Sequence, residues 1–307
     1  MHVKTEIFSK LLRDLEAEIG TGDLGKLILQ SMILSIENLK VNDAKAFMEQ
    51  LVGIMEIFAN TEPKFGIINY NLKKFYQAFS NEFGKDKSSH KKWKKLAIKE
   101  LEEILNLAKK QKQLLLENAE KIDVDGKTIL IHDHSHSVQD VLVHYKKMGK
   151  HFRVVIAEQE LEKTHSNIER LHNAEIPFQV VPAYMLSHVH RKVDMLFFGA
   201  VTLKDTMDFV MDPGTNGLIS EFHVAKVPIY MFIVANKFSL WKSKKRAEVF
   251  IHKHLRKHED KAIEYERIKY SHDRVPSNLF HKIITDRGIF TPVQLKKFFA
   301  AQMKKYG

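Results

Sequence analysis

The chain has 307 residues, 44% of them hydrophobic, and its 49 Lys and Arg exceed its 38 Asp and Glu to give a formal charge of +11. Because it has no cysteine, disulfides, thiolate metal sites and cysteine nucleophiles are excluded. No run approaches the roughly 20 apolar residues that cross a bilayer, and the first residues lack the apolar core of a signal peptide. We therefore expect a cytoplasmic protein of two domains with an acidic partner.

Residues 1–122 are expected to form a helical N-terminal domain. Apolar residues recur at helical spacing in five successive segments, which start near residues 1, 23, 43, 67 and 86. Asn42 or Asp43 is a candidate N-cap of the third segment. The fifth and longest segment runs to about Lys121 and ends at the turn sequence DVDGK.

Residues 123–307 are expected to form a Rossmann-like α/β domain. Helical stretches around 137–149, 163–174, 183–191 and 216–226 separate five short apolar runs, which are KTILIHD, FRVVIAE, FQVVP, VDMLFFGA and PIYMFIVA. Such continuous apolar runs indicate strands covered on both faces, as in a doubly wound parallel sheet. These sheets bind ligands outside the carboxyl ends of their strands, so HDHSHS, AEQE, GAVT and ANKF should face one crevice.

The C-terminal part is expected to be a basic helical segment of the second domain. Residues 242–258 carry seven Lys or Arg and one Glu. A solvated helix face explains such a run, and direct contact with RNA or an acidic protein is the alternative. Pro276 is placed near the start of a helix that Gly288 ends, and Pro292 starts a last short helix.

The sequence ILIHDHSHS places His132, His134 and His136 at alternate positions directly after the first strand. In a continued strand they would share one face, and imidazoles bind zinc and iron. Metal hydrolases with this pattern are eight-stranded barrels, whereas only five strands are predicted here, with no further metal-binding His or Asp at the strand ends. We therefore favour a polar, ligand-facing loop and predict no metal.

Phosphate binding is the next possibility. There is no GxGxxG or Walker A sequence, so neither hydride transfer nor classical nucleotide hydrolysis is expected, and no cofactor is predicted. In MDPGTNG, Gly214, Thr215 and Asn216 lie at the start of a helix, where backbone N–H groups attract anions. A simple helix-start turn explains the sequence equally well. Lys237, after the last strand, is a candidate charge partner in the same crevice.

Over residues 60–295 these stretches, in order, resemble the family of eukaryotic initiation factor 2B regulatory subunits (alpha, beta and delta) and their relatives, the isomerases of ribose-1,5-bisphosphate and methylthioribose-1-phosphate. The similar stretches are EPKFGIINYNL, GKTILIHDHSHSVQDVL, FRVVIAEQE, VDMLFFGAVTL, MDPGTNGL, VPIYMFIVANKF and YSHDRVPSNLFHKIITDRGIFTP. The resemblance implies a helical domain before a Rossmann-like domain, and dimerisation through the latter.

Departures from the family pattern fall at the positions that carry the isomerase chemistry. The family's isomerases have a catalytic cysteine where this chain has Asp133, and an aspartate where it has Val201. The pair Met211-Asp212 stands where the family has Asn-Lys. A lysine attracts phosphate, whereas the aspartate repels it. Other positions match the family pattern: His132, Ser135, Glu158, Gly199, Ala200, Gly214, Thr215 and Lys237.

We expect a non-catalytic, initiation-factor-2B-like protein that acts by assembly and binds a phosphorylated metabolite. The expected ligand-binding residues are His132, His134, Ser135, His136, Glu158, Gly199, Ala200, Gly214, Thr215, Asn216 and Lys237. The expected partner is a second copy or a related subunit, joined through the α/β domain, with RNA or an acidic protein at residues 242–258. The alternative is an aldose-ketose isomerase of a sugar phosphate, in which Asp133 is the base beside His134 or His136.

Overall fold

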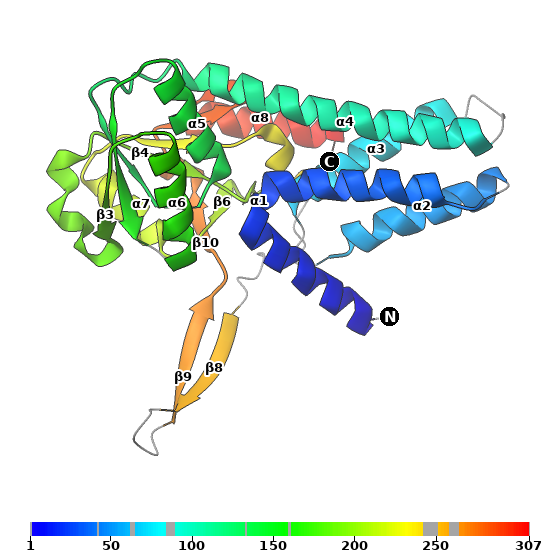
Figure 1. The fold of residues 1–307 in the computed structure, drawn as a ribbon, viewed down its shortest axis with the longest axis horizontal. Coiled ribbons are helices and arrows are strands. Elements are labelled where there is room, and N and C mark those ends of the chain that lie inside the picture. The colour runs from blue at the N-terminus through cyan, green and yellow to red at the C-terminus, as the bar shows by residue number, and fades with distance from the viewer. Residues whose placement is uncertain are drawn as a thin grey trace.

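The computed structural model describes residues 2–41, 43–61, 65–83, 90–132, 134–158, 161–241, 251–257 and 264–306. A helical N-terminal region is followed by a mostly parallel sheet with helices on its faces (Figure 1). The predicted fold class, an α/β protein with a helical N-terminal part, is therefore confirmed.

The helical region forms the five predicted segments, but the first two are joined into one element. Its helices are α1 (His2–Asn38), α2 (Ala44–Ala59), α3 (Gly66–Phe83) and α4 (His90–Ala119). Helix α1 is kinked at Gly20, which has a φ of 76° that glycine adopts without strain. Asp43 caps α2 by accepting the Ala46 N–H at 2.8 Å, whereas Asn42, the other candidate, lies outside the described residues.

The main sheet has seven strands in the order β12-β11-β7-β4-β1-β2-β3. Their bounds are β1 (Thr128–Ile131), β2 (Arg153–Glu158), β3 (Phe178–Pro182), β4 (Met195–Gly199), β7 (Ile229–Phe232), β11 (Lys282–Thr285) and β12 (Gly288–Phe290). All neighbours are parallel except β11 and β12. The strand order reverses between β1 and β4, which is where a doubly wound sheet opens a crevice for a ligand.

Helices cover both faces of the sheet, which explains the continuous apolar runs. They are α5 (His136–Lys147), α6 (Leu161–Asn173), α7 (Thr215–Val224), α8 (Pro292–Tyr306) and the 3-10 turns η1 (Ala183–His188), η2 (His190–Lys192), η3 (Ala235–Lys237) and η4 (Ser277–Leu279). In β4, Leu196 and Phe198 belong to one buried apolar cluster, while Met195 and Phe197 belong to another. Among the described helices, none has the length and apolarity that a membrane span requires.

Several strands were not predicted. A three-stranded sheet contains β5 (Thr202–Leu203), β6 (Asp208–Met211) and β10 (Asp273–Pro276), and a separate hairpin contains β8 (Ile251–Lys257) and β9 (Glu264–Tyr270). The predicted basic helix is therefore wrong over 251–257, which pairs with β9; residues 242–250 and 258 lie outside the described residues.

The helix predicted between Pro276 and Gly288 is also wrong. Pro276 ends β10, and the apolar residues before Gly288 form β11, whose backbone pairs in parallel with β7. Pairing with a strand that is distant in sequence outweighs the local pattern here. The helix predicted at 183–191 is the pair of 3-10 turns η1 and η2.

A buried polar network joins the helical region to the sheet. The Asp286 carboxylate, directly after β11, accepts the Ala235 N–H at 2.7 Å and the Gln111 side-chain amide at 3.0 Å. The Asn236 amide donates in turn to Gln111 Oε1 at 3.1 Å. Because buried polar groups are costly unless they are hydrogen-bonded, this network fixes α4 and η3 against the end of the sheet.

Gly66 at the start of α3 permits a second close contact between the two regions. A Cβ atom at this position would lie 2.7 Å from the carbonyl oxygen of Lys237 and 2.7 Å from Oγ1 of Thr202. Such a separation is far inside van der Waals contact, so a side chain would push α3 away from η3.

We predict that Gly66→Ala lowers the free energy of unfolding by about 1–3 kcal/mol, because it overpacks this contact. Gly53→Ala in α2 is the matched control, since nothing lies within 4 Å of its added Cβ. The control should stabilise the protein by about 0.5–1 kcal/mol through helix propensity. Urea unfolding measures both changes, and equal effects of the two variants would contradict the close approach.

Candidate functional site

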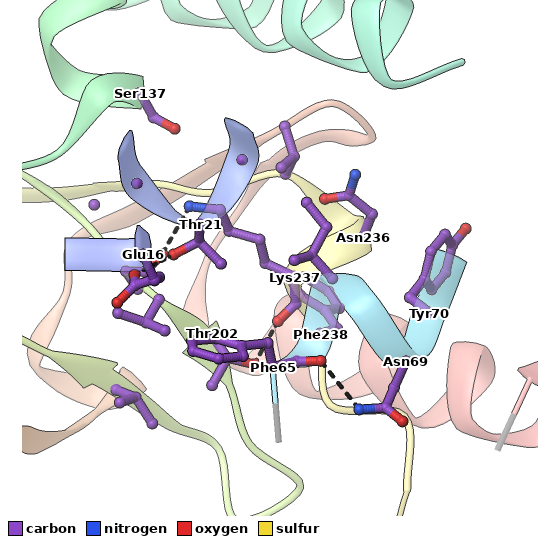
Figure 2. A pocket seen from close by; sticks show the side chains of 18 of the residues that line it. Glu16, Thr21, Phe65, Asn69, Tyr70, Ser137, Thr202, Asn236, Lys237 and Phe238 are labelled. Atoms are coloured by element: carbon purple, nitrogen blue, oxygen red, sulfur yellow. Dashed lines mark hydrogen bonds between the residues drawn. The ribbon is translucent and has the colours of Figure 1, made fainter. Parts of the chain in front are cut away.

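A crevice of about 1320 Å³ lies between the helical region and the carboxyl ends of β1 and β4 (Figure 2). The sheet contributes residues 134–137 after β1, residues 199–202 after β4 and residues 236–238 after β7. The helical region contributes the kink of α1 at residues 20–23 and several side chains of α3. Three of the four strand-end sequences therefore face one crevice, at the reversal of strand order.

The kink in α1 packs directly on the loop after β1. A Cβ atom at Gly20 would lie 2.9 Å from Nδ1 of His136, so glycine allows the two segments to meet. His136 Nδ1 also lies 3.7 Å from Oδ2 of Asp23. A second contact spans the kink, since the Thr21 hydroxyl after it donates to Oε1 of Glu16 before it at 2.7 Å. The kink thus turns Glu16 and Thr21 towards the crevice (Figure 2).

The three histidines of the loop have different surroundings. His132 is 4% exposed and lies beneath Gly214, where a Cβ atom would be 3.6 Å from its Nε2. His134 Nε2 lies 2.8 Å from the Ser166 hydroxyl, and the rings of His134 and His136 meet edge-on with centroids 4.9 Å apart. Burial lowers the pKa of all three imidazoles, which favours their uncharged forms.

The described part of the chain contains no group of three His, Cys, Asp or Glu side chains that could hold a metal ion. Ser135 has a structural role, since it caps α5 by accepting the Val138 N–H at 3.4 Å. Asp133, the candidate base of the isomerase alternative, lies outside the described residues.

Two lysines and two carboxylates meet inside the crevice. The Lys163 ammonium pairs with Asp212 at 2.8 Å, and the Lys237 ammonium donates to the Ala200 carbonyl at 3.1 Å. The Lys237 side chain extends towards Thr21 and Glu16 (Figure 2). Burial raises the pKa of the Glu16 carboxyl, and the nearby charge of Asp212 raises it further.

The lining as a whole is basic. Its cationic side chains are Arg13, Lys26, Lys73, Lys74, Lys112, Lys163, Lys204, Lys237 and Arg274. Its acidic side chains are Glu16, Asp23, Asp140 and Asp212. Nine cations against four anions produce a positive potential, and the walls of a cleft concentrate such a potential on an anionic ligand.

Five of the predicted ligand-binding residues are not among those that line the crevice. Gly214, Thr215 and Asn216 form the start of α7, where the Asp273 carboxylate accepts the Asn216 N–H at 2.8 Å. The protein's own carboxylate thus occupies the position expected for a phosphate. Glu158 is exposed at the end of β2. The six predicted residues that do line the crevice are His134, Ser135, His136, Gly199, Ala200 and Lys237. His132 is buried and is not part of the lining.

Sequence reasoning missed Glu16, Thr21 and Lys163. Glu16 and Lys163 look like ordinary charged positions of amphipathic helices. A signal for the first two was present, because Gly20 and Gly22 interrupt a helical pattern, and glycines at such positions often mark a kink or a close approach.

We predict that Glu16→Gln stabilises the protein more at pH 7 than at pH 4. Since the folded state raises the Glu16 pKa, it binds more protons than the unfolded state, and stability falls as pH rises above about 4.5, the unperturbed value. The amide carries no charge and escapes this loss. Urea unfolding at both pH values measures the difference. The exposed Glu18→Gln on the same helix is the control, and an equal pH dependence in both variants would contradict the burial of Glu16.

Comparison with known proteins identifies related chains. The model of the Initiation factor 2 subunit family matches residues 19–292. The translation initiation factor eIF2B subunit alpha of Dictyostelium discoideum is 27% identical over 139 residues, which are 45% of this chain and 43% of that protein. The chain thus aligns with less than half of the length of this relative.

Solved structures share the fold. The Pyrococcus horikoshii OT3 translation initiation factor eIF-2B superposes with a TM-score of 0.75 at 18% identity, covering 94% of this chain and 98% of that one. The tetrameric eIF2B-beta2-delta2 complex from C. thermophilum gives 0.74 at 16% identity, covering 98% and 94%. Together with the family match over most of the chain, the predicted resemblance is confirmed: the chain belongs to the Initiation factor 2 subunit family.

Proposed function

We propose that this protein is a cytoplasmic regulatory and assembly subunit that binds a phosphorylated metabolite in its crevice without isomerising it. The observation that carries this proposal is Val201. The residue follows Gly199 and Ala200 into the crevice, where the isomerases of the family have an aspartate, and it packs against the apolar cluster of the helical region. A valine transfers no proton, so the retained crevice lacks one of the two groups that the isomerisation uses.

The binding of an anionic metabolite is supported by the charge and size of the crevice. The lining has an excess of cations, and the crevice volume of about 1320 Å³ exceeds the roughly 300–1,000 Å³ typical of small-molecule sites, so a sugar phosphate fits inside. The Lys237 ammonium is a cationic donor inside it, whereas the start of α7 is capped by Asp273. We therefore assign the phosphate to the Lys237 side of the crevice rather than to α7.

We predict that ribose-1,5-bisphosphate binds to the protein in isothermal titration calorimetry and that Lys237→Ala weakens binding on the order of tenfold, because a charge-assisted hydrogen bond is lost. Lys109→Ala, at an exposed position of α4, is the control and should bind like the wild type. No ketose should form during incubation. A ketose product that Asp133→Asn abolishes would instead establish the isomerase alternative.

Assembly through the sheet region is supported by apolar side chains at one edge of the sheet. Strand β3 is the last strand of the sheet, and its Val180 is 39% exposed. In the following turn η1, Tyr184 is 82% and Met185 is 44% exposed. Neighbouring apolar side chains in solvent at a sheet edge are typical of surfaces that another chain covers. A second copy or a related subunit would bury them.

We predict that the protein sediments as a dimer at micromolar concentration and that Tyr184→Glu shifts it towards the monomer, because a charge is placed in an apolar interface. Ile57→Glu is the control, since Ile57 is 56% exposed on α2 of the helical region. Sedimentation velocity measures both. A monomeric wild type that dimerises only with an added eIF2B-like subunit would favour the hetero-oligomer, and dissociation by Ile57→Glu alone would place the interface on the helical region.

A further inference from the structure

The β8–β9 hairpin extends away from the rest of the molecule (Figure 1). Its strands pair in antiparallel register over seven residue pairs, from Ile251 opposite Tyr270 to Lys257 opposite Glu264. Residues of β9 are exposed on both faces, since Tyr265 is 49%, Ile268 is 47% and Tyr270 is 55% exposed, and Arg267 is exposed as well. The hairpin is thus a two-stranded ribbon with both faces of β9 in solvent.

The register separates the charges of the ribbon. Directly opposed residues share a face of an antiparallel pair, and successive residues alternate between the faces. One face therefore holds the positions of the pairs 252–269, 254–267 and 256–265. Its residues are His252, His254, Arg256, Tyr265, Arg267 and Lys269, which include three Lys or Arg and no acid. Both glutamates of β9, Glu264 and Glu266, fall on the opposite face.

We propose that this cationic face binds the phosphate backbone of single-stranded RNA. Positions two residues apart along a strand are separated by roughly 7 Å, so the basic positions of this face follow two parallel rows along the ribbon. Such a spacing suits an extended chain of phosphates. Arginine guanidinium groups match phosphate oxygens in geometry, and a tyrosine among cations offers a ring on which an unpaired base stacks. Base stacking adds an attraction that a partner recognised by charge alone does not have, which favours single-stranded RNA over an acidic protein. The described side chains of β9 are not among those that line the crevice, so this proposal is independent of the metabolite site.

The test is fluorescence anisotropy of the full chain with a fluorescein-labelled 20-nucleotide poly(U) RNA at salt concentrations between about 50 and 200 mM. Each phosphate contact on a single strand contributes about 0.7 to the slope of log affinity against log salt. With at least three contacts, the wild type should lose about 20-fold in affinity across this range. The double variant Arg267→Glu/Lys269→Glu should bind at least about tenfold more weakly at low salt and lose only about threefold.

Two control variants separate the hairpin from a general effect of charge. Lys296→Glu/Lys297→Glu makes the same change in net charge at exposed positions of α8 and should retain the wild-type slope. Tyr265→Ala should weaken binding about fivefold or more without changing the slope, because stacking is independent of counterion release. Unchanged thermal unfolding midpoints establish that the variants are folded.

Two results would overturn the proposal. One is a hairpin variant that keeps the affinity and the salt slope of the wild type. The other is competition by poly-glutamate as strong as that by an equal charge of unlabelled RNA, which would assign the face to an acidic protein.

Discussion

The buried carboxylate of Asp286 is the interaction on which the position of the crevice depends. Its side chain is fully buried, and such a charge is tolerated only when it is paired and hydrogen-bonded. Its partners come from three places: the backbone of η3, the amide of Gln111 on α4 and the Arg287 guanidinium at 3.2 Å. Because η3 carries Lys237, one carboxylate sets both the contact between helical region and sheet and the place of a cation inside the crevice.

From the opposite side, two glycines allow helices to approach the strand ends closely. Gly66 brings α3 against η3, and Gly20 brings the kink of α1 against His136. The enclosed space contains imidazoles whose pKa is lowered by burial, a glutamate whose pKa is raised by burial, and an excess of lysine and arginine. This combination suits an anion held by a few donors. The proposal that the crevice transfers no proton rests on Val201, which stands where the family's isomerases have an aspartate.

The sequence predicted those parts of the fold that local patterns determine. Helical periodicity located the segments of α1 to α4, and apolar runs located β1, β2, β3, β4 and β7 close to their observed bounds. Pairing between strands that are distant in sequence determines other parts of the fold. Strand β11 forms because it pairs with β7, and the basic segment contains β8 because this strand pairs with β9. The loop after β1 was placed at the crevice by topology alone. Glu16, more than a hundred residues earlier, and the capping of α7 by Asp273 required the three-dimensional structure.

One measurement tests the proposal that the crevice binds the metabolite but has lost the isomerase chemistry. It is a crystal structure of the protein grown with saturating ribose-1,5-bisphosphate. We predict electron density for the intact aldose in the crevice, with a phosphate group within hydrogen-bonding distance of the Lys237 ammonium. Density for the ketose, or an empty crevice at saturating ligand, would contradict a protein that binds the metabolite without converting it.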